Sequence, residues 1–136
     1  MTTPDIELVL RCFEAFGEHD VDKLLTMLHP DVEVRSLMTE AERQTYTGHE
    51  GVREWIAAVF DIFPDWSPTP TDLRDLGGAV VIGMDVLATA TTSGVPIDQR
   101  FWAAATMHDG KLSWYGFFRT EDDALEAVAN RRLLQS

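Results

Sequence analysis

The stretch Ile97–Arg119, IDQRFWAAATMHDGKLSWYGFFR, decides the fold, because it contains two long β-rich runs joined by a very short polar break. The break is His108-Asp109-Gly110, and Asp-Gly supplies the backbone freedom that a tight hairpin turn requires. The sequence therefore predicts two antiparallel strands that form the centre of a sheet.

The two runs carry bulky side chains on both faces of the predicted sheet. Alternate residues of a strand face opposite sides, so one face receives Phe101, Ala103, Ala105, Tyr115 and Phe117, and the other receives Trp102, Trp114 and Phe118. A solvated face would show polar residues at every second position. We therefore expect helices of this chain to cover the first face and a second copy to cover the other, as a homodimer. The alternative is that these aromatic residues are scattered on the surface.

The composition sets limits on the protein class. A chain of 136 residues with 45% hydrophobic content suits one domain, residues 1–136, with a proper core. The net charge of −12 argues against nucleic acid and anionic membranes as partners. The single cysteine, Cys12, and the absence of a signal-like N-terminus or a long apolar run favour a cytoplasmic protein.

Outside the hairpin, the chain alternates between helical and strand patterns. We expect helices over residues 3–17, 20–28, 46–64 and from residue 120 onward, and strands over 31–37, 66–76 and 79–91. Residues 38–45 are polar and irregular, which is typical of a loop over a pocket mouth. The order predicts an α+β fold in which helices stack on one face of a curved antiparallel sheet.

Three stretches together resemble a known family: Arg11–Val34, the YTGHEGVREW run at Tyr46–Trp55, and DGKLSWYGFF at Asp109–Phe118. They are similar to the SnoaL-like branch of the nuclear-transport-factor-2-like superfamily. The resemblance implies a cone-shaped α+β barrel with the last helix as a brace, and it covers nearly the whole chain. Ketosteroid isomerases, polyketide cyclases and limonene-type epoxide hydrolases share this fold, so the resemblance does not fix the function.

Most catalytic acids of these relatives are replaced in this chain. By the resemblance, the oxyanion tyrosine, general-base aspartate and protonated aspartate of ketosteroid isomerase fall on Cys12, Ser36 and Ala103. The aspartate that polyketide cyclases carry on the last strand, which is also the second aspartate of the epoxide hydrolases, falls on Phe117. The other epoxide-hydrolase aspartate is retained as Asp85. The resemblance therefore argues against ketosteroid isomerisation.

Asp85 and Tyr115 are the candidate catalytic residues. Asp85 lies in the apolar run VVIGMDVLATA, where an inward carboxylate would be desolvated and could act as an acid or base near neutral pH. The family register favours that inward orientation, whereas the periodicity favours Met84 inward and Asp85 toward solvent. Tyr115 could donate a hydrogen bond to a ligand oxygen, or it could be an ordinary core tyrosine.

Ala103 and Ala105 predict a hollow on the concave side of the sheet, because two small side chains leave volume that larger neighbours must fill. The alternatives are that neighbouring side chains plug this volume or that it forms a dry pocket. The expected ligand-binding walls are Cys12, Phe16, Ser36, Trp55, Val59, Phe101, Ala103, Ala105 and Phe117, together with Asp85 and Tyr115.

These features support three hypotheses for the function. The first is a cofactor-free, metal-free enzyme that performs acid/base chemistry on a small hydrophobic metabolite, with Asp85 as proton shuttle and Tyr115 as donor. The second is a binding protein without chemistry, and the third is a dimeric scaffold with a filled cavity. No histidine pair has metal-ligand spacing, and no glycine-rich nucleotide motif occurs.

Overall fold

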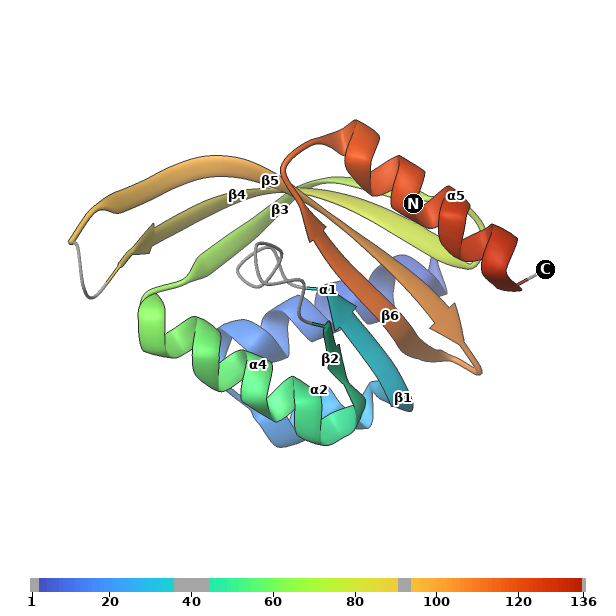
Figure 1. The fold of residues 1–136 in the computed structure, drawn as a ribbon, viewed down its shortest axis with the longest axis horizontal. Coiled ribbons are helices and arrows are strands. Elements are labelled where there is room, and N and C mark those ends of the chain that lie inside the picture. Colours follow the sequence, from blue (N-terminus) through green and yellow to red (C-terminus); the bar gives the residue numbers. More distant parts are fainter. Residues whose placement is uncertain (1–2, 36–44, 91–93, 136) are drawn as a thin grey trace.

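The computed structural model describes residues 3–35, 45–90 and 94–135. These residues form four helices and six strands: α1 (Pro4–Gly17), α2 (Val21–Thr26), β1 (Leu28–Arg35), β2 (Thr45–Thr47), α4 (Gly48–Ile62), β3 (Ser67–Asp75), β4 (Ala79–Thr89), β5 (Pro96–His108), β6 (Lys111–Phe118) and α5 (Glu121–Gln135). Figure 1 shows α1, α2 and α4 on one side of a curved sheet and α5 on the other. The predicted α+β class is confirmed.

The β5–β6 hairpin confirms the prediction from its turn residues. His108 pairs with Lys111, so the turn has two residues, Asp109 and Gly110. Both have positive φ angles, 53° and 74°, as a hairpin turn that follows the strand twist requires. β5 and β6 occupy the middle of the sheet, so the hairpin positions the strands on both sides.

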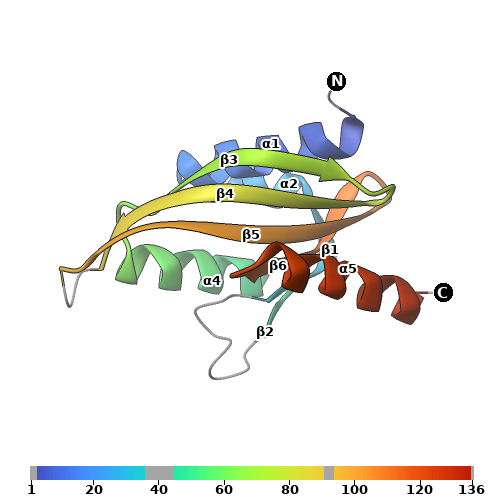
Figure 2. The same cartoon turned by 90° about the horizontal axis from the view of Figure 1, so that it is seen from above.

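The sheet is mixed rather than antiparallel, which corrects the predicted topology. Its strand order is β2-β1-β6-β5-β4-β3, and β1 runs parallel to β6 while the other pairs are antiparallel. Alternating hydrophobicity indicates a strand but does not reveal the direction of its neighbour. The sequence does not predict β2, because a strand of three residues is too short to show an alternating pattern. Figure 2 shows β3, β4 and β5 side by side along the molecule.

Capping residues fix the ends of three helices at the predicted positions. The Thr3 hydroxyl accepts a hydrogen bond from the Ile6 N–H at 3.3 Å, and the Asp20 carboxylate accepts one from the Lys23 N–H at 3.1 Å. The Thr120 hydroxyl does the same for the N–H of Asp123 at 3.1 Å. Each cap satisfies a helix N–H that has no partner within the helix.

None of the described helices is long and apolar enough to span a membrane.

α5 covers the convex face of the sheet, which corrects part of the argument for a partner. Trp114 and Phe118, which we expected a second copy to bury, are only 5% and 6% exposed within this single chain. They pack in one cluster with Ala124 and Val128 of α5. Arg131 secures the far end of this helix, because its Nη1 donates to Glu33 of β1 at 2.9 Å and its guanidinium lies 5.4 Å from the Trp114 ring centroid.

Glycines in the central strands make room for these convex-face rings. A Cβ atom on Gly116 would lie 2.7 Å from the Phe118 ring and 2.9 Å from the Trp114 ring. On β4, a Cβ atom on Gly83 would lie 2.9 Å from the ring of Trp102. The rings therefore lie close to bare backbone, where any larger residue would push them outward.

Gly116→Ala should destabilise the fold. The rings of Trp114 and Phe118 are held under α5 and cannot yield freely, so we expect a loss of about 1–3 kcal/mol in the free energy of unfolding, as for other overpacked cores. Urea denaturation measures this loss. Gly17→Ala at the end of α1, where an added Cβ would meet nothing within 4 Å, is the matched control and should cost nothing. Equal stability of the two variants would contradict the close packing at Gly116.

Candidate functional site

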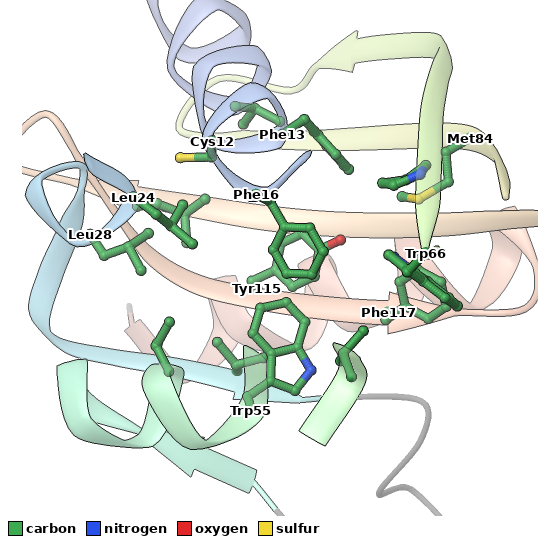
Figure 3. Close-up of a pocket in the computed structure, with 16 residues that line it drawn as sticks. Cys12, Phe13, Phe16, Leu24, Leu28, Trp55, Trp66, Met84, Tyr115 and Phe117 are labelled. Atoms are coloured by element: carbon green, nitrogen blue, oxygen red, sulfur yellow. The ribbon is translucent and has the colours of Figure 1, made fainter. Parts of the chain in front are cut away.

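A cavity of about 70 Å³ lies between the concave face of the sheet and the helices α1, α2 and α4. Figure 3 shows aromatic rings and aliphatic chains converging on it. The lining residues are Val9, Cys12, Phe13, Phe16, Leu24, Leu28, Val34, Val52, Trp55, Val59, Trp66, Pro68, Met84, Leu112, Tyr115 and Phe117. Its walls therefore come from three helices and four strands, together with Trp66 just before β3.

Helical spacing brings the side chains of two helices to the cavity. On α1, Val9, Cys12, Phe13 and Phe16 follow one another at intervals of three, one and three residues, which places them on one face of a helix. On α4, Val52, Trp55 and Val59 repeat in the same way. Because α1 and α4 pack on the same side of the sheet (Figure 1), the two apolar stripes meet over it.

A cluster of tilted aromatic rings forms the middle of the cavity wall. The ring centroids of Phe16 and Trp55 are 5.4 Å apart, and those of Trp55 and Tyr115 are 5.9 Å apart. Trp66 and Phe117 form a second pair, with their ring centroids 5.8 Å apart. These separations are those of favourable aromatic pairs, so the rings hold one another in place.

None of the described residues that line the cavity has a side chain that is ionised at neutral pH. Among the described lining residues there is no carboxylate, histidine, lysine or arginine. Burial raises the pKa of the Cys12 thiol to about 12, partly opposed by the charge of Arg11. Desolvation raises the pKa of Tyr115 as well, with a further contribution from Cys12. Both groups are therefore neutral and protonated, and each can donate a hydrogen bond.

The indole nitrogen of Trp55 is a buried donor without a partner among the described residues. The residue itself is half-buried, while this nitrogen is shielded from solvent. Native structures pair nearly all such groups, since an unpaired buried donor costs about 1–3 kcal/mol. The indole N–H of Trp55 is thus an unpaired hydrogen-bond donor in a mostly apolar wall.

The structure brings six of the predicted wall residues together at the cavity: Cys12, Phe16, Trp55, Val59, Tyr115 and Phe117. Ser36 lies outside the described residues. Phe101 is buried in the adjacent core, with its ring centroid 5.0 Å from that of Phe117, and it does not line the cavity.

The hollow expected beside Ala103 and Ala105 is not there. Both alanines are fully buried and absent from the cavity lining. Ala103 pairs with Phe117 and Ala105 with Tyr115 across the β5–β6 ladder. The small residues therefore lie beside large rings on the next strand, and the cavity lies farther in, against Phe16 and the helices.

The inward orientation of Asp85 was wrong. Asp85 is exposed, whereas its neighbour Met84 is fully buried and lines the cavity. Residues at even positions of β4 pack into the concave core, and odd positions face the convex side. The strand period thus predicted the orientation correctly, and the family register did not.

Ten lining residues were not predicted as walls: Val9, Phe13, Leu24, Leu28, Val34, Val52, Trp66, Pro68, Met84 and Leu112. Several carried a usable signal, because Val9 and Phe13 belong to the apolar stripe of the first helix and Met84 has the inward register. No local sequence pattern indicates that Trp66 and Pro68 line the cavity. They reach it because β3 packs against α1, a contact between segments distant in the sequence.

One group of potential metal ligands assembles outside the cavity. Donor atoms of His29, His108 and Asp109 lie within 4.8 Å of one another. Sequence spacing could not reveal this group, because β1 and the β5–β6 turn meet only in the fold. The Nδ1 atom of His29 accepts a hydrogen bond from the N–H of Asp31 at 3.0 Å, so metal binding at this nitrogen would have to break that bond.

Comparison with known proteins identifies relatives of the whole fold. The model of the SnoaL-like domain family matches residues 9–115, and no curated protein matches the chain. The structure of TerC co-crystallised with polyporic acid is similar at 25% identity and a TM-score of 0.76, over 98% of this chain and 100% of that one.

Two further solved structures share the fold at lower identity. An NTF2-like protein of unknown function from Burkholderia pseudomallei is 19% identical, with a TM-score of 0.78 over 92% of this chain and 97% of that one. A protein from Catenulispora acidiphila with a ketosteroid isomerase-like fold, in complex with trimethylamine, is 18% identical, with a TM-score of 0.75 over 92% of both chains.

Cys12 should be nearly inert to thiol reagents in the folded protein. Its raised pKa leaves very little thiolate at pH 8, and the thiolate is the reacting species. We expect Ellman's reagent to react on the order of 100-fold more slowly than in guanidinium chloride. Because Cys12 is the only cysteine of the chain, the unfolded protein is a complete internal control. Rapid stoichiometric labelling of the folded protein would contradict the burial of this thiol.

Proposed function

Because the chain belongs to the SnoaL-like domain family, we propose that it binds a small, uncharged, hydrophobic organic molecule in the cavity between the sheet and the helices α1, α2 and α4. The observation that carries this proposal is the apolar lining, in which no described residue is ionised at neutral pH. Pockets of this kind gain affinity from apolar contact and orientation from few polar groups.

The geometry favours binding over acid/base catalysis. A general acid or base must lie within hydrogen-bond reach of the proton it transfers. Asp85 is exposed on the convex side, and the raised pKa of Tyr115 makes it a poor proton source at neutral pH. Any chemistry in this cavity would rely on polarisation of a ligand oxygen by neutral donors.

A structural relative supports the binding of an organic molecule by this fold. TerC, which is 25% identical over nearly the whole of both chains, was crystallised with polyporic acid. That observation belongs to TerC, and it supports here only the general idea that this fold accommodates an organic small molecule.

The size of the cavity restricts the ligand. A volume of about 70 Å³ is roughly half that of an engineered apolar cavity of about 150 Å³ that holds benzene. A ligand with one ring must therefore move some lining side chains outward. Phe13 and Pro68 are only half-buried and belong to none of the ring pairs described above, so these two residues can yield with the least loss of packing.

Binding of α-methylstyrene, a one-ring hydrocarbon, tests the proposal. We expect it to shift amide resonances of lining residues in ¹⁵N-labelled protein, and Val59→Phe, which fills the cavity from α4, should weaken binding by about tenfold or more. If Val59→Phe does not fold, Leu112→Phe, which fills the cavity from β6, takes its place in the test. Asp85→Asn is the control and should bind like the unchanged protein. The absence of saturable shifts would overturn the proposed function.

We also propose that the protein is a homodimer through the part of the convex face that α5 leaves open. Leu87 is 57% exposed, and Trp102 on the paired strand β5 is half-buried. Such apolar exposure is what a second copy would cover.

Sedimentation velocity at micromolar concentration should therefore give the mass of two chains. Leu87→Asp should shift the protein toward one chain, because it places a charge in the apolar contact. Ala57→Asp, at an exposed position of α4 on the opposite side of the sheet, is a control for added charge alone. A one-chain mass for the unchanged protein would exclude the dimer.

A further inference from the structure

We propose that Trp55 determines ligand specificity by donating a hydrogen bond from its indole nitrogen to an uncharged acceptor oxygen, such as a carbonyl, on the bound molecule. This inference rests on the proposed function and deepens it, because it assigns a chemical group to the ligand and a recognising atom to the protein. It concerns Trp55, a residue that the sequence identifies only as a wall of the pocket.

The unpartnered state of this nitrogen is unusual within the structure. Among the described residues only two buried side-chain nitrogen or oxygen atoms lack a hydrogen-bond partner: Trp55 Nε1 and Arg131 Nε. Arg131 lies on α5 and is otherwise engaged with Glu33 and Trp114. Trp55 is instead a residue of the cavity wall, so a bound molecule that moves the lining side chains outward can bring the missing acceptor to this nitrogen.

The surrounding rings hold the indole in this position. Phe16 and Tyr115 pack against Trp55 with centroid separations of 5.4 and 5.9 Å. In Figure 3, the Trp55 nitrogen and the Tyr115 hydroxyl are both directed toward the side of the pocket formed by Trp66 and Phe117. The indole nitrogen and the phenol hydroxyl therefore lie toward one end, and the opposite end is formed by Leu24, Leu28 and the thiol of Cys12.

The available donors define the ligand group. An indole N–H can only donate, and Tyr115 stays protonated because desolvation raises its pKa. A ligand acceptor is thus satisfied, whereas a ligand donor would find few partners. A carboxylate is disfavoured, since no cation lines the described part of the cavity and an unpaired buried charge is very costly. The class that fits is an apolar, ring-containing molecule with a carbonyl-type oxygen at one end.

A pair of isosteric probes tests this inference. Acetophenone carries a carbonyl oxygen where α-methylstyrene carries a methylene group, so the two differ in the acceptor but not in the number of heavy atoms. We expect the protein to bind acetophenone about fivefold more tightly, the range of one neutral hydrogen bond. In ¹⁵N–¹H spectra, acetophenone should move the Trp55 indole proton downfield, and α-methylstyrene should not.

Variants of two pocket tryptophans assign the effect. Trp55→Phe should remove the preference for acetophenone, so that the ratio of the two affinities falls to about one whatever the change in each. Trp66→Phe, which removes another indole from the same pocket, should keep the preference. The four tryptophans of the chain give four indole signals, and the Trp55 signal is the one that Trp55→Phe abolishes.

The outcomes separate this inference from the proposed function. If neither probe binds, the pocket is not a ligand site and the proposed function fails. If both probes bind equally and the Trp55 indole signal does not respond to the carbonyl, the pocket binds ligands but the acceptor assignment is wrong. A preference that persists in Trp55→Phe also overturns the role of Trp55.

Discussion

Aromatic side chains project from both faces of β6, and neither face can be left in water without a large loss of apolar burial. Tyr115 and Phe117 require cover on the concave side, and Trp114 and Phe118 require it on the convex side. The chain provides α1, α2 and α4 for the first face and α5 for the second (Figure 1). The ion pair of Arg131 with Glu33 then ties α5 back to β1, the parallel neighbour of β6.

The cavity follows from the way the concave side is covered. Rings from α1, α4 and β6 meet at tilts of 42° and 47° rather than in flat stacks. A cavity of about 70 Å³ remains among these rings. On the convex side, Trp114 and Phe118 also meet at a tilt, of 40°. There, Gly116 lets both rings approach the backbone closely, and Ala124 and Val128 of α5 pack against them.

The sequence predicts six of the residues that line the cavity, but it predicts neither the position of the cavity within the concave core nor the orientation of Asp85. Helical and strand periods identified Phe16, Trp55 and Tyr115 as inward-facing, because these periods depend only on local geometry. The family register places Asp85 inward, whereas the period of its own strand places it outward, and the structure agrees with the strand period. The sequence could not show that the Trp55 indole nitrogen lacks a hydrogen-bond partner, because this depends on the positions of all the groups around it in the fold.

The sequence by itself determined the α+β class, the hairpin turn at Asp109-Gly110, the helix caps and the inward face of each long element. These features depend on contacts between residues close in the chain. The tertiary structure alone decided that β1 runs parallel to β6, that α5 rather than a partner buries Trp114, and where the cavity lies. Each of these depends on which distant segments of the chain come into contact, and local sequence patterns do not specify those contacts.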